Sequence, residues 1–408
     1  MKRQTQSLSS TRLMRSANAV SVLRTLYNEG GCSRPRLTRL TRMSPATITR
    51  IIAELLDQGF IRESGVAESS GGRKAAILEL NYDRIFILGI QALRDRVDLA
   101  VTDLRGRFVA RRSFCPYSLE PDSMIEEMTK GIEALLDESA VAKERLIGVG
   151  VAISGIVDSV NGILQRSTNL GWREVAIAKA LDEGLGIPVV VENDANAAAL
   201  AELWFGLAKE ASSFLYIKTD RGVGAGVIYE RNLLVGARGM SGEIGHVPLM
   251  RPGRPCRCGQ SGCLETYLYI PDVLRRYEKA TGRRLAGGEE FFALAGEGDA
   301  DAAAMVAEAA EALGVAASLA AGLLDLDMVV IGGIWGRLGH EFMRKIRRVY
   351  QAVLEGSGLS KDLAVIGSGL GEEADLLGAA GLVIARWLTP PIQASYAGRM
   401  FHVEKELV

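Results

Sequence analysis

The chain has 408 residues, a formal net charge of −1 and only five cysteines. This length suits two or three domains with sizeable cores. Five cysteines, two of them isolated at Cys32 and Cys115, do not form a disulfide framework. No unbroken apolar run reaches the roughly 18 residues of a membrane span, and the basic start lacks the apolar core of a signal peptide. We therefore expect a cytoplasmic protein without membrane insertion.

Charge is unevenly distributed along the chain. Residues 1–84 hold 14 Lys and Arg against 7 Asp and Glu, so the remainder is acidic. A small basic module on an acidic body indicates that the module meets a polyanion. The alternative is a solvated basic face with no partner.

The first elements predicted are three short helices. Residues 17–28 carry apolar side chains at helical spacing, and Gly30 and Gly31 end that segment. A second helix is expected over 35–41, and a third over the segment PATITRIIAELLD that follows Ser44.

The third helix has the features of a DNA-recognition helix. Ser44 is a good N-cap, and Pro45 suits the first helical position. Four apolar residues between Ile48 and Leu55 share one side, which can pack on the other two helices. Small and hydrogen-bonding side chains on the other side are suited to reach base edges. These candidate DNA-contacting residues are Ser44, Ala46, Thr47, Thr49 and Arg50.

A hairpin is expected after the third helix. Residues 60–66 and 75–81 predict two strands, and Gly71-Gly72 between them permits a tight turn. Arg73 and Lys74 would lie at its tip, where basic side chains suit phosphate or minor-groove contact. Residues 1–82 are thus predicted to form a winged helix-turn-helix DNA-binding domain. A three-helix protein-interaction module is the alternative.

From residue 85 the pattern changes to strands, three of which precede an alternation of strands and helices. This order predicts a mixed-sheet α/β body in which a second strand group opens a second lobe. The strands are expected at 85–92, 97–103, 107–114, 146–153, 188–192, 214–219, 224–229 and 328–333, and the helices at 121–139, 174–186, 302–322 and 374–388. The segment NDANAAALAELWFG at 193–206 follows the fifth of these strands.

The segment GEIGHVPLMRPGRPCRCGQSGCLE places one imidazole and three thiols within eighteen residues, at His246, Cys256, Cys258 and Cys263. Four such ligands are what a closed, tetrahedral zinc site requires. Tight cysteine clusters in intracellular chains are more often metal sites than bridges. We therefore predict a structural Zn²⁺ site in loop 246–263; three unrelated thiols or a disulfide are the alternatives.

Six motifs occur in a fixed order: SGIVDSVNGIL, STNLGW, VVVENDANAAALAE, GVGAGVI, GEIGHVPL and CRCGQSGCLE. Together they resemble the ROK family (repressors, open reading frames and sugar kinases) over residues 12–388. The resemblance implies a two-lobed actin/hexokinase-like (ribonuclease H-like) body, with a small lobe at 83–195 and a large lobe at 196–373. The helix at 374–390 would return to the small lobe. The preceding helix-turn-helix is similar to the family's transcriptional branch, which responds to sugars such as N-acetylglucosamine, glucose and xylose.

The resemblance also implies site residues. It assigns zinc ligation to the imidazole and three thiols above, and it implies a sugar pocket in the cleft between the lobes. Carboxylates and amides suit this role because they bind ring hydroxyls through charge-assisted or bidentate hydrogen bonds. A structural role as a cap or a buried hydrogen-bond partner is the alternative for each. The implied sugar-binding residues are Asn169, Asn193, Asp194, Glu243, His246 and Glu265.

The phosphate loop departs from that of the family's sugar kinases, which have Asp-x-Gly-Gly-Thr after the first strand. Here Gln91 replaces the acid, Leu93 and Arg94 replace both glycines, and Asp95 replaces the threonine. The second phosphate loop is also altered, at Asp220-Arg221. Phosphoryl transfer depends on positioning and charge stabilisation. We therefore predict no kinase activity, although Asp194 matches the kinase general base.

These features predict a sugar-responsive transcriptional regulator, most simply a repressor of carbohydrate uptake or catabolism genes. It would bind operator DNA as a homodimer or homotetramer, because two half-sites need two recognition helices. A sugar or sugar phosphate would be the effector. Two alternatives stay open: an ATP-dependent sugar kinase fused to a DNA-binding head, and a repressor controlled by a protein partner such as a sugar-transport component.

Overall fold

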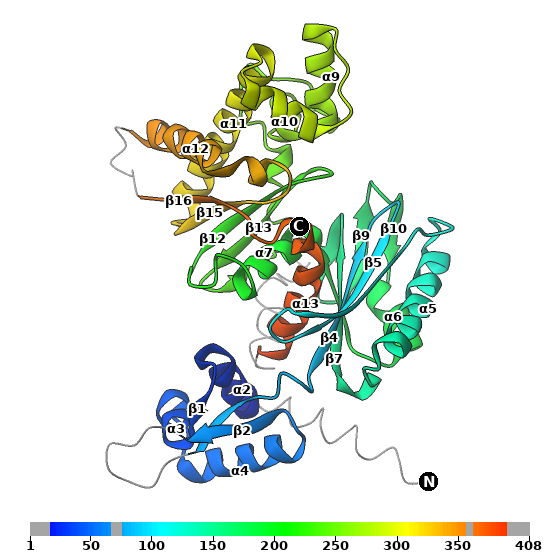
Figure 1. The fold of residues 1–408 in the computed structure, drawn as a ribbon, viewed down its shortest axis with the longest axis vertical. Coiled ribbons are helices and arrows are strands. Elements are labelled where there is room, and N and C mark those ends of the chain that lie inside the picture. The colour runs from blue at the N-terminus through cyan, green and yellow to red at the C-terminus, as the bar shows by residue number, and fades with distance from the viewer. Residues whose placement is uncertain (1–16, 67–75, 356–361, 390–408) are drawn as a thin grey trace, which may run out of the picture.

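The computed structural model describes residues 17–66, 76–355 and 362–389. An N-terminal head precedes two lobes, and each lobe is built around one five-stranded sheet (Figure 1).

The head consists of three helices and a small sheet of order β1-β3-β2, the arrangement of a winged helix-turn-helix fold. As predicted, Ser44 caps the third helix, because its Oγ accepts a hydrogen bond from the Thr47 amide at 3.1 Å. Ile48, Ile51 and Leu55 are buried on one side of that helix. The head elements are α2 Ala17–Glu29, β1 Cys32–Ser33, α3 Arg34–Thr41, α4 Pro45–Asp57, β2 Ile61–Val66 and β3 Ala76–Leu80.

The first lobe has a mixed sheet of order β11-β7-β4-β5-β6. Strands β4, β5 and β6 are antiparallel neighbours, whereas β7 and β11 run parallel to β4. Helices α5 and α6 pack on one face, and a side sheet of order β10-β9-β8 extends the lobe (Figure 1). Its elements are β4 Phe86–Ala92, β5 Val97–Asp103, β6 Phe108–Phe114, α5 Pro121–Ser139, η1 Lys143–Arg145, β7 Leu146–Ile153, β8 Ile156–Asp158, β9 Ile163–Ser167, β10 Trp172–Val175, α6 Ile177–Leu185 and β11 Val189–Asn193.

The second lobe repeats the same strand order, as β14-β13-β12-β15-β16. Again the first three strands are antiparallel neighbours and the last two are parallel to the first. The repeat confirms the expected two-lobed, mixed-sheet body. The elements are β12 Phe214–Thr219, β13 Val223–Tyr229, β14 Asn232–Leu233, η2 Ile244–His246, α8 Glu265–Leu268, α9 Ile270–Thr281, α10 Gly288–Glu297, α11 Ala300–Leu324, β15 Met328–Ile331, η3 Trp335–Leu338, α12 Gly339–Leu354 and β16 Ala364–Gly367.

Two helices, α7 (Asp194–Trp204) and α13 (Ala374–Trp387, after η4 Gly371–Glu373), lie side by side in the middle of the molecule (Figure 1). They approach each other closely because small residues face one another. A Cβ atom at Gly378 would lie 2.3 Å from the carbonyl of Ala197. Helix α13 also packs on β4 and β7, where a Cβ atom at Gly150 would lie 1.8 Å from the carbonyl oxygen of Ala379.

The head is joined to the body by a continuous apolar core. This core includes head residues such as Leu23 and Leu55 and body residues such as Ile87 and Ile384. Burying apolar side chains in this shared core stabilises the contact between head and body, by about 25 cal/mol for each Å² of apolar surface removed from water.

Helix α11 is the one described helix long and apolar enough to cross a membrane, with a mean hydropathy of 1.4 over its most apolar 18-residue window. Half of that window is buried inside the protein. Residues such as Ala309, Leu313 and Ala317 have no exposed surface and belong to the core of the second lobe. Helix α11 therefore packs as a core helix of the second lobe.

The close approach at Gly150 generates a stability prediction. In Gly150→Ala the new methyl group meets a backbone carbonyl, so α13 must shift, and overpacking of this kind costs about 1–3 kcal/mol. We expect a lower midpoint of urea unfolding. Gly296→Ala is the control, because that α10 glycine has no heavy atom within 4 Å of the added Cβ and helical alanine is favoured over glycine by up to about 1 kcal/mol. Equal stability of Gly150→Ala and the wild type would contradict the packing described.

Candidate functional site

The two lobes meet at a buried ammonium group. Lys218 lies on β12, and its Nζ donates to an Asp194 carboxylate oxygen at 2.9 Å and to the Asp375 carboxylate. Asp375 also accepts a hydrogen bond from the Gln91 side chain, which comes from β4 of the first lobe. We call these four residues the Lys218 network.

The Lys218 network is stabilised by geometry and by helix ends. Asp194 and Asp375 lie in the first turns of α7 and α13, where the helix dipole favours negative charge. Burial alone lowers the pKa of Lys218, but the charges of Asp194 and Asp375 raise it well above its ordinary value. Burial raises the pKa of Asp375 to about 6, opposed by Lys218 and assisted by Asp194. The two carboxylates therefore favour the charged form of the lysine.

Three of the predicted sugar-binding residues, Asn169, Asn193 and Asp194, come from the first lobe and the start of α7. Asn169 is exposed, and its amide donates to the Ser154 hydroxyl at 3.1 Å. Asn193 is the N-cap of α7: its side-chain oxygen accepts from the Ala195 and Asn196 amides, and its nitrogen donates to the Gly155 carbonyl. This leaves one amide hydrogen of Asn193 for a ligand.

The other three, Glu243, His246 and Glu265, come from the second lobe. Glu243 is solvent-exposed, yet desolvation by the surrounding protein raises its pKa, and nearby Asp194 and Glu265 add to the rise while His246 opposes it. Glu265 is buried and accepts from the Arg257 guanidinium at 2.9 Å and from the Val223 amide at 3.3 Å.

His246 and the three cysteines of loop 246–263 come together. The ligand atoms of His246, Cys256 and Cys258 lie within 4.8 Å of one another, a group suited to hold a metal ion. The Cys256 Sγ is 3.8 Å from the His246 Nδ1, and the Cys258 Sγ is 3.7 Å from the Cys263 Sγ. The fourth predicted ligand, Cys263, thus adjoins Cys258, while the group whose ligand atoms lie within 4.8 Å of one another contains the other three.

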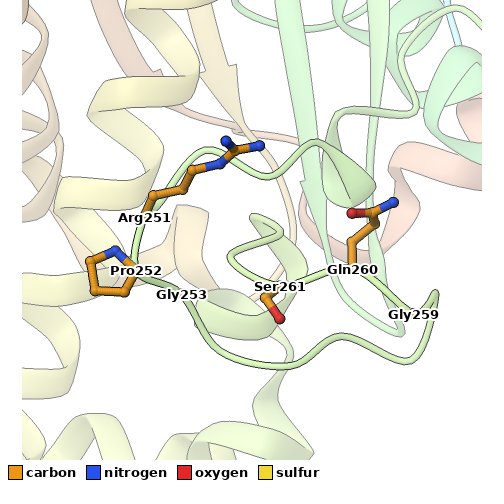
Figure 2. A pocket seen from close by; sticks show the side chains of 6 residues that line it. All are labelled: Arg251, Pro252, Gly253, Gly259, Gln260 and Ser261. Atoms are coloured by element: carbon orange, nitrogen blue, oxygen red, sulfur yellow. The ribbon is translucent and has the colours of Figure 1, made fainter.

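The backbone of this loop is folded back on itself. Isolated bridges pair Pro248 with Cys263 and Pro255 with Ser261. Gly262 has a φ of +83° and packs against the Met250 carbonyl, so only glycine fits there. An open hollow of about 530 Å³ lies on this loop, and none of the predicted sugar or metal residues lines it. Figure 2 shows the side chains that surround it. It is lined by Arg251, Pro252, Gly253, Gly259, Gln260 and Ser261.

The two altered phosphate loops contact each other. The Arg221 guanidinium, from the loop between β12 and β13, pairs with both carboxylate oxygens of Asp95 at 2.7 and 3.1 Å, and this pairing lowers the pKa of Asp95. Arg94 donates to the Asn169 carbonyl oxygen at 2.9 Å. In the first altered loop, Asp95 therefore contacts the second lobe through Arg221, and Arg94 contacts the backbone of Asn169.

Predicted DNA-contacting residues lie together at the start of α4. Ser44, Ala46, Thr49 and Arg50 are exposed and Thr47 is half-buried. Arg50 forms an ion pair with Glu54 one turn later, at 3.1 Å. The other two predicted contacts, Arg73 and Lys74, lie outside the described residues.

Sequence reasoning missed part of the site. Lys218 is 8 % exposed on a strand of apolar residues, and Asp375 is 7 % exposed on an apolar helix. A charged residue is seldom fully buried unless it is paired. A lone charge within an apolar strand or helix was therefore the sequence signal that could have indicated a buried ion pair. Glu265 was predicted as a sugar-binding residue, but no signal in the sequence indicated that it pairs with Arg257.

A helix-turn-helix head on a duplicated, two-lobed actin-like body with a His/Cys cluster defines the class of this protein. The ROK family model matches residues 87–386, and the MarR family model matches residues 16–64. The chain belongs to the ROK family.

Relatives of this chain include repressors and kinases. The xylose repressor of Caldicellulosiruptor bescii is 26% identical over 394 residues, which cover 93% of this chain and 98% of that protein. A crystal structure of a ROK family transcriptional regulator, homologous to the Escherichia coli MLC protein, superposes with a TM-score of 0.83 and 25% identity, covering 95% of this chain and 100% of that one. The ROK hexokinase from Thermus thermophilus is 29% identical with a TM-score of 0.65, and covers 74% of this chain and 99% of its own.

The Lys218 network predicts a pH-dependent loss of stability in Lys218→Met. Removing the ammonium leaves the buried Asp375 carboxylate and the partly buried Asp194 carboxylate without a cation, and breaking a buried ion pair costs about 3–5 kcal/mol. The pKa of Asp375, already about 6, rises further without its partner. An acid whose pKa is raised on folding destabilises the fold as pH increases through that pKa, so the loss should be larger at pH 8 than at pH 5.

Urea unfolding at the two pH values measures this loss. Lys179→Met is the control, because the Lys179–Glu183 pair is exposed and surface substitutions stay within about 0.5 kcal/mol. An equal loss at pH 5 and pH 8 would show that charge is not its cause.

Proposed function

We propose that this ROK protein is a sugar-responsive transcriptional regulator, most simply a cytoplasmic repressor of carbohydrate uptake or catabolism genes. One observation carries the proposal: a helix-turn-helix head shares an apolar core with a body whose two altered phosphate loops carry charged side chains, Asp95 and Arg221, that pair with each other. The resemblance to the xylose repressor over 93% of the chain supports it.

Loss of kinase activity is part of this proposal. A general base must be free to take a proton, yet the Asp194 carboxylate is held by the Lys218 ammonium at 2.9 Å. Phosphate binding needs backbone amides that approach the nucleotide, whereas the Arg221–Asp95 pair sets two charged side chains between the altered loops. Asp95 would also repel phosphate oxygens.

The effector we infer is a sugar or sugar phosphate. Exposed Asn169 and Glu243 and the partly buried Asn193 and Asp194 offer oxygen and nitrogen atoms from both lobes. Ring hydroxyls can bridge such groups, because each hydroxyl both donates and accepts hydrogen bonds. Binding across both lobes would change their relative position, so the effector distinguishes two conformations of the body.

Operator DNA is the partner we infer for the head. Exposed Arg50 and the hydroxyl-bearing residues at the start of α4 are suited to base and phosphate contacts. A homodimer or homotetramer would present two such helices to the two half-sites of an operator. A sugar-transport protein acting in place of a free sugar is the alternative, and it would leave isolated sugars without effect on DNA binding.

The metal that we infer for loop 246–263 is a structural Zn²⁺ ion held by His246, Cys256, Cys258 and Cys263. Ligand atoms bonded to one tetrahedral zinc ion lie roughly 3.5–3.8 Å apart, and the 3.7 and 3.8 Å separations between these side chains fit that spacing. Metal bound at Nδ1 would leave the Nε2 atom of His246 for a sugar hydroxyl. Zinc would also hold Arg257, and through it Glu265, in place.

The function is tested by DNA binding with and without sugar. A DNA fragment selected from a random pool by the full chain serves as the operator probe, and pentoses, hexoses and amino sugars, free and phosphorylated, serve as effectors. We expect one sugar class to weaken DNA binding by about 5–150-fold, the usual range of allosteric coupling. Failure of every sugar to bind in calorimetry would favour control by a protein partner. ATP-dependent phosphorylation of a sugar at ordinary kinase rates would overturn the proposal.

A matched pair of variants places the DNA contact. Arg50→Ala is expected to weaken operator binding without changing sugar affinity, because a bidentate base contact contributes about 1–3 kcal/mol. Arg283→Ala, at a residue of the second lobe beyond α9, is the control and should leave both affinities unchanged. Normal operator binding by Arg50→Ala would remove that side chain from the interface.

The zinc site is tested by elemental analysis. Cys258→Ser is expected to lower zinc from about one ion per chain to a small fraction, because three ligands form an incomplete shell, and to lower the thermal unfolding midpoint. Cys115→Ser is the control, since this exposed thiol lies outside the cluster. Unchanged zinc content in Cys258→Ser would refute the assignment.

A further inference from the structure

Helices α7 and α13 each join the candidate effector site to the DNA-binding head. Both begin at the Lys218 network, with Asp194 in the first turn of α7 and Asp375 in that of α13. Both run towards the head, where they end at Trp204 and Trp387 (Figure 1). Their 11 and 14 residues span roughly 16 and 21 Å at the helical rise of 1.5 Å per residue.

The head rests on the far ends of these helices through aromatic side chains. The ring of Tyr27, from α2, meets the ring of Trp204 edge-on, with centroids 5.2 Å apart. The Tyr27 hydroxyl donates to the Leu104 carbonyl at 3.3 Å. Phe60, which follows α4, packs against Trp387 with ring centroids 6.2 Å apart. We call Tyr27, Phe60, Trp204 and Trp387 the aromatic seat.

The two helices are packed too tightly to absorb a displacement between them. Gly378 lies against the backbone of Ala197, and Gly381 lies against Leu200 and Trp204. Interiors packed at this density transmit strain because no voids take it up. A shift of the first turn of either helix must therefore reach its last turn.

The upper ends of the helices are the part that a ligand can change. Asp194 is both a candidate sugar-binding residue and a partner of Lys218, and Asn193 is both a candidate and the cap of α7. A hydroxyl that binds either group competes with contacts that now hold the start of α7. The same ammonium holds α13 through Asp375, so the two helices respond together.

We propose that the Lys218 network, helices α7 and α13 and the aromatic seat form one coupling unit that transmits effector binding to the head. Effector binding shifts the paired helices, and the aromatic seat converts that shift into a change in the position of α4. The inference rests on the proposed sugar-responsive function and specifies its route.

The first test measures coupling as the ratio of operator affinities without and with the effector found in the sugar screen, in the full chain. Tyr27→Leu and Phe60→Leu keep an apolar side chain in the seat but remove the ring contacts. We expect this ratio to fall at least fivefold towards one in both variants, with calorimetric sugar affinity unchanged within twofold. Phe292→Leu is the control, because it removes a comparable ring contact with Trp335 inside the second lobe (4.9 Å). A ratio that stays within twofold of the wild type in both seat variants would overturn the proposal.

The second test needs neither DNA nor sugar, so it separates this inference from the proposed function. Amide hydrogen exchange is compared between the wild type and Lys218→Gln, with peptides of α9 and α10 as the internal reference for global stability. We expect peptides of α2 and α4 to exchange faster in Lys218→Gln by at least threefold relative to that reference. Lys179→Gln should not change them. If exchange in the α2 and α4 peptides changes only as much as in the reference peptides, the proposed coupling unit is wrong. If exchange in the head changes but no sugar binds the chain, only the sugar-responsive function is wrong.

Discussion

The arrangement of this molecule depends on one constraint, that a lysine ammonium removed from water must be surrounded by carboxylates. Lys218 meets that requirement with Asp194 and Asp375, which come from separate parts of the chain. Satisfying one charge therefore fixes the relative position of β12, α7 and α13. Because these elements hold the two lobes and support the head, a single buried pairing links every large unit of the protein.

A second charge pair, Arg221–Asp95, lies where the two altered loops of the kinase-like body meet. Phosphate loops need bare backbone, whereas this chain has Leu93, Arg94 and Asp95 in the first loop and Arg221 in the second. Arg221 and Asp95 bind each other across the lobes. Exposed ion pairs of this kind contribute little to stability, about 0–1 kcal/mol. The main effect of this pair is therefore to place two charged side chains between the altered loops.

Local sequence patterns were enough to predict the head helices, the strands of the first sheet and the proximity of His246 to Cys256 and Cys258. Ser44 and the apolar side of α4 are read directly from spacing, and His246 with its cysteines is read from ligand chemistry. Helices α9, α10 and α12 and strand β16 were not predicted, although the apolar residues of α9 and α12 recur at helical spacing and could have revealed those two helices. The Lys218–Asp375 contact joins residues 157 positions apart, and no local pattern reports such a distance. The predicted DNA contacts all stay predictions, and two of them, Arg73 and Lys74, lie outside the described residues.

The repeated strand order gives the lobe junction an internal two-fold character. Gln91 is the penultimate residue of the first strand in one half, and Lys218 holds that place in the other. Asp194 and Asp375 likewise open the helix that follows the fifth strand of each half. The junction thus resembles a dimer interface within one chain. At matching positions of the two repeated sheets, one half carries the neutral amide of Gln91 and the other the ammonium of Lys218. That single asymmetry gives the two halves unequal electrostatics at otherwise matched positions.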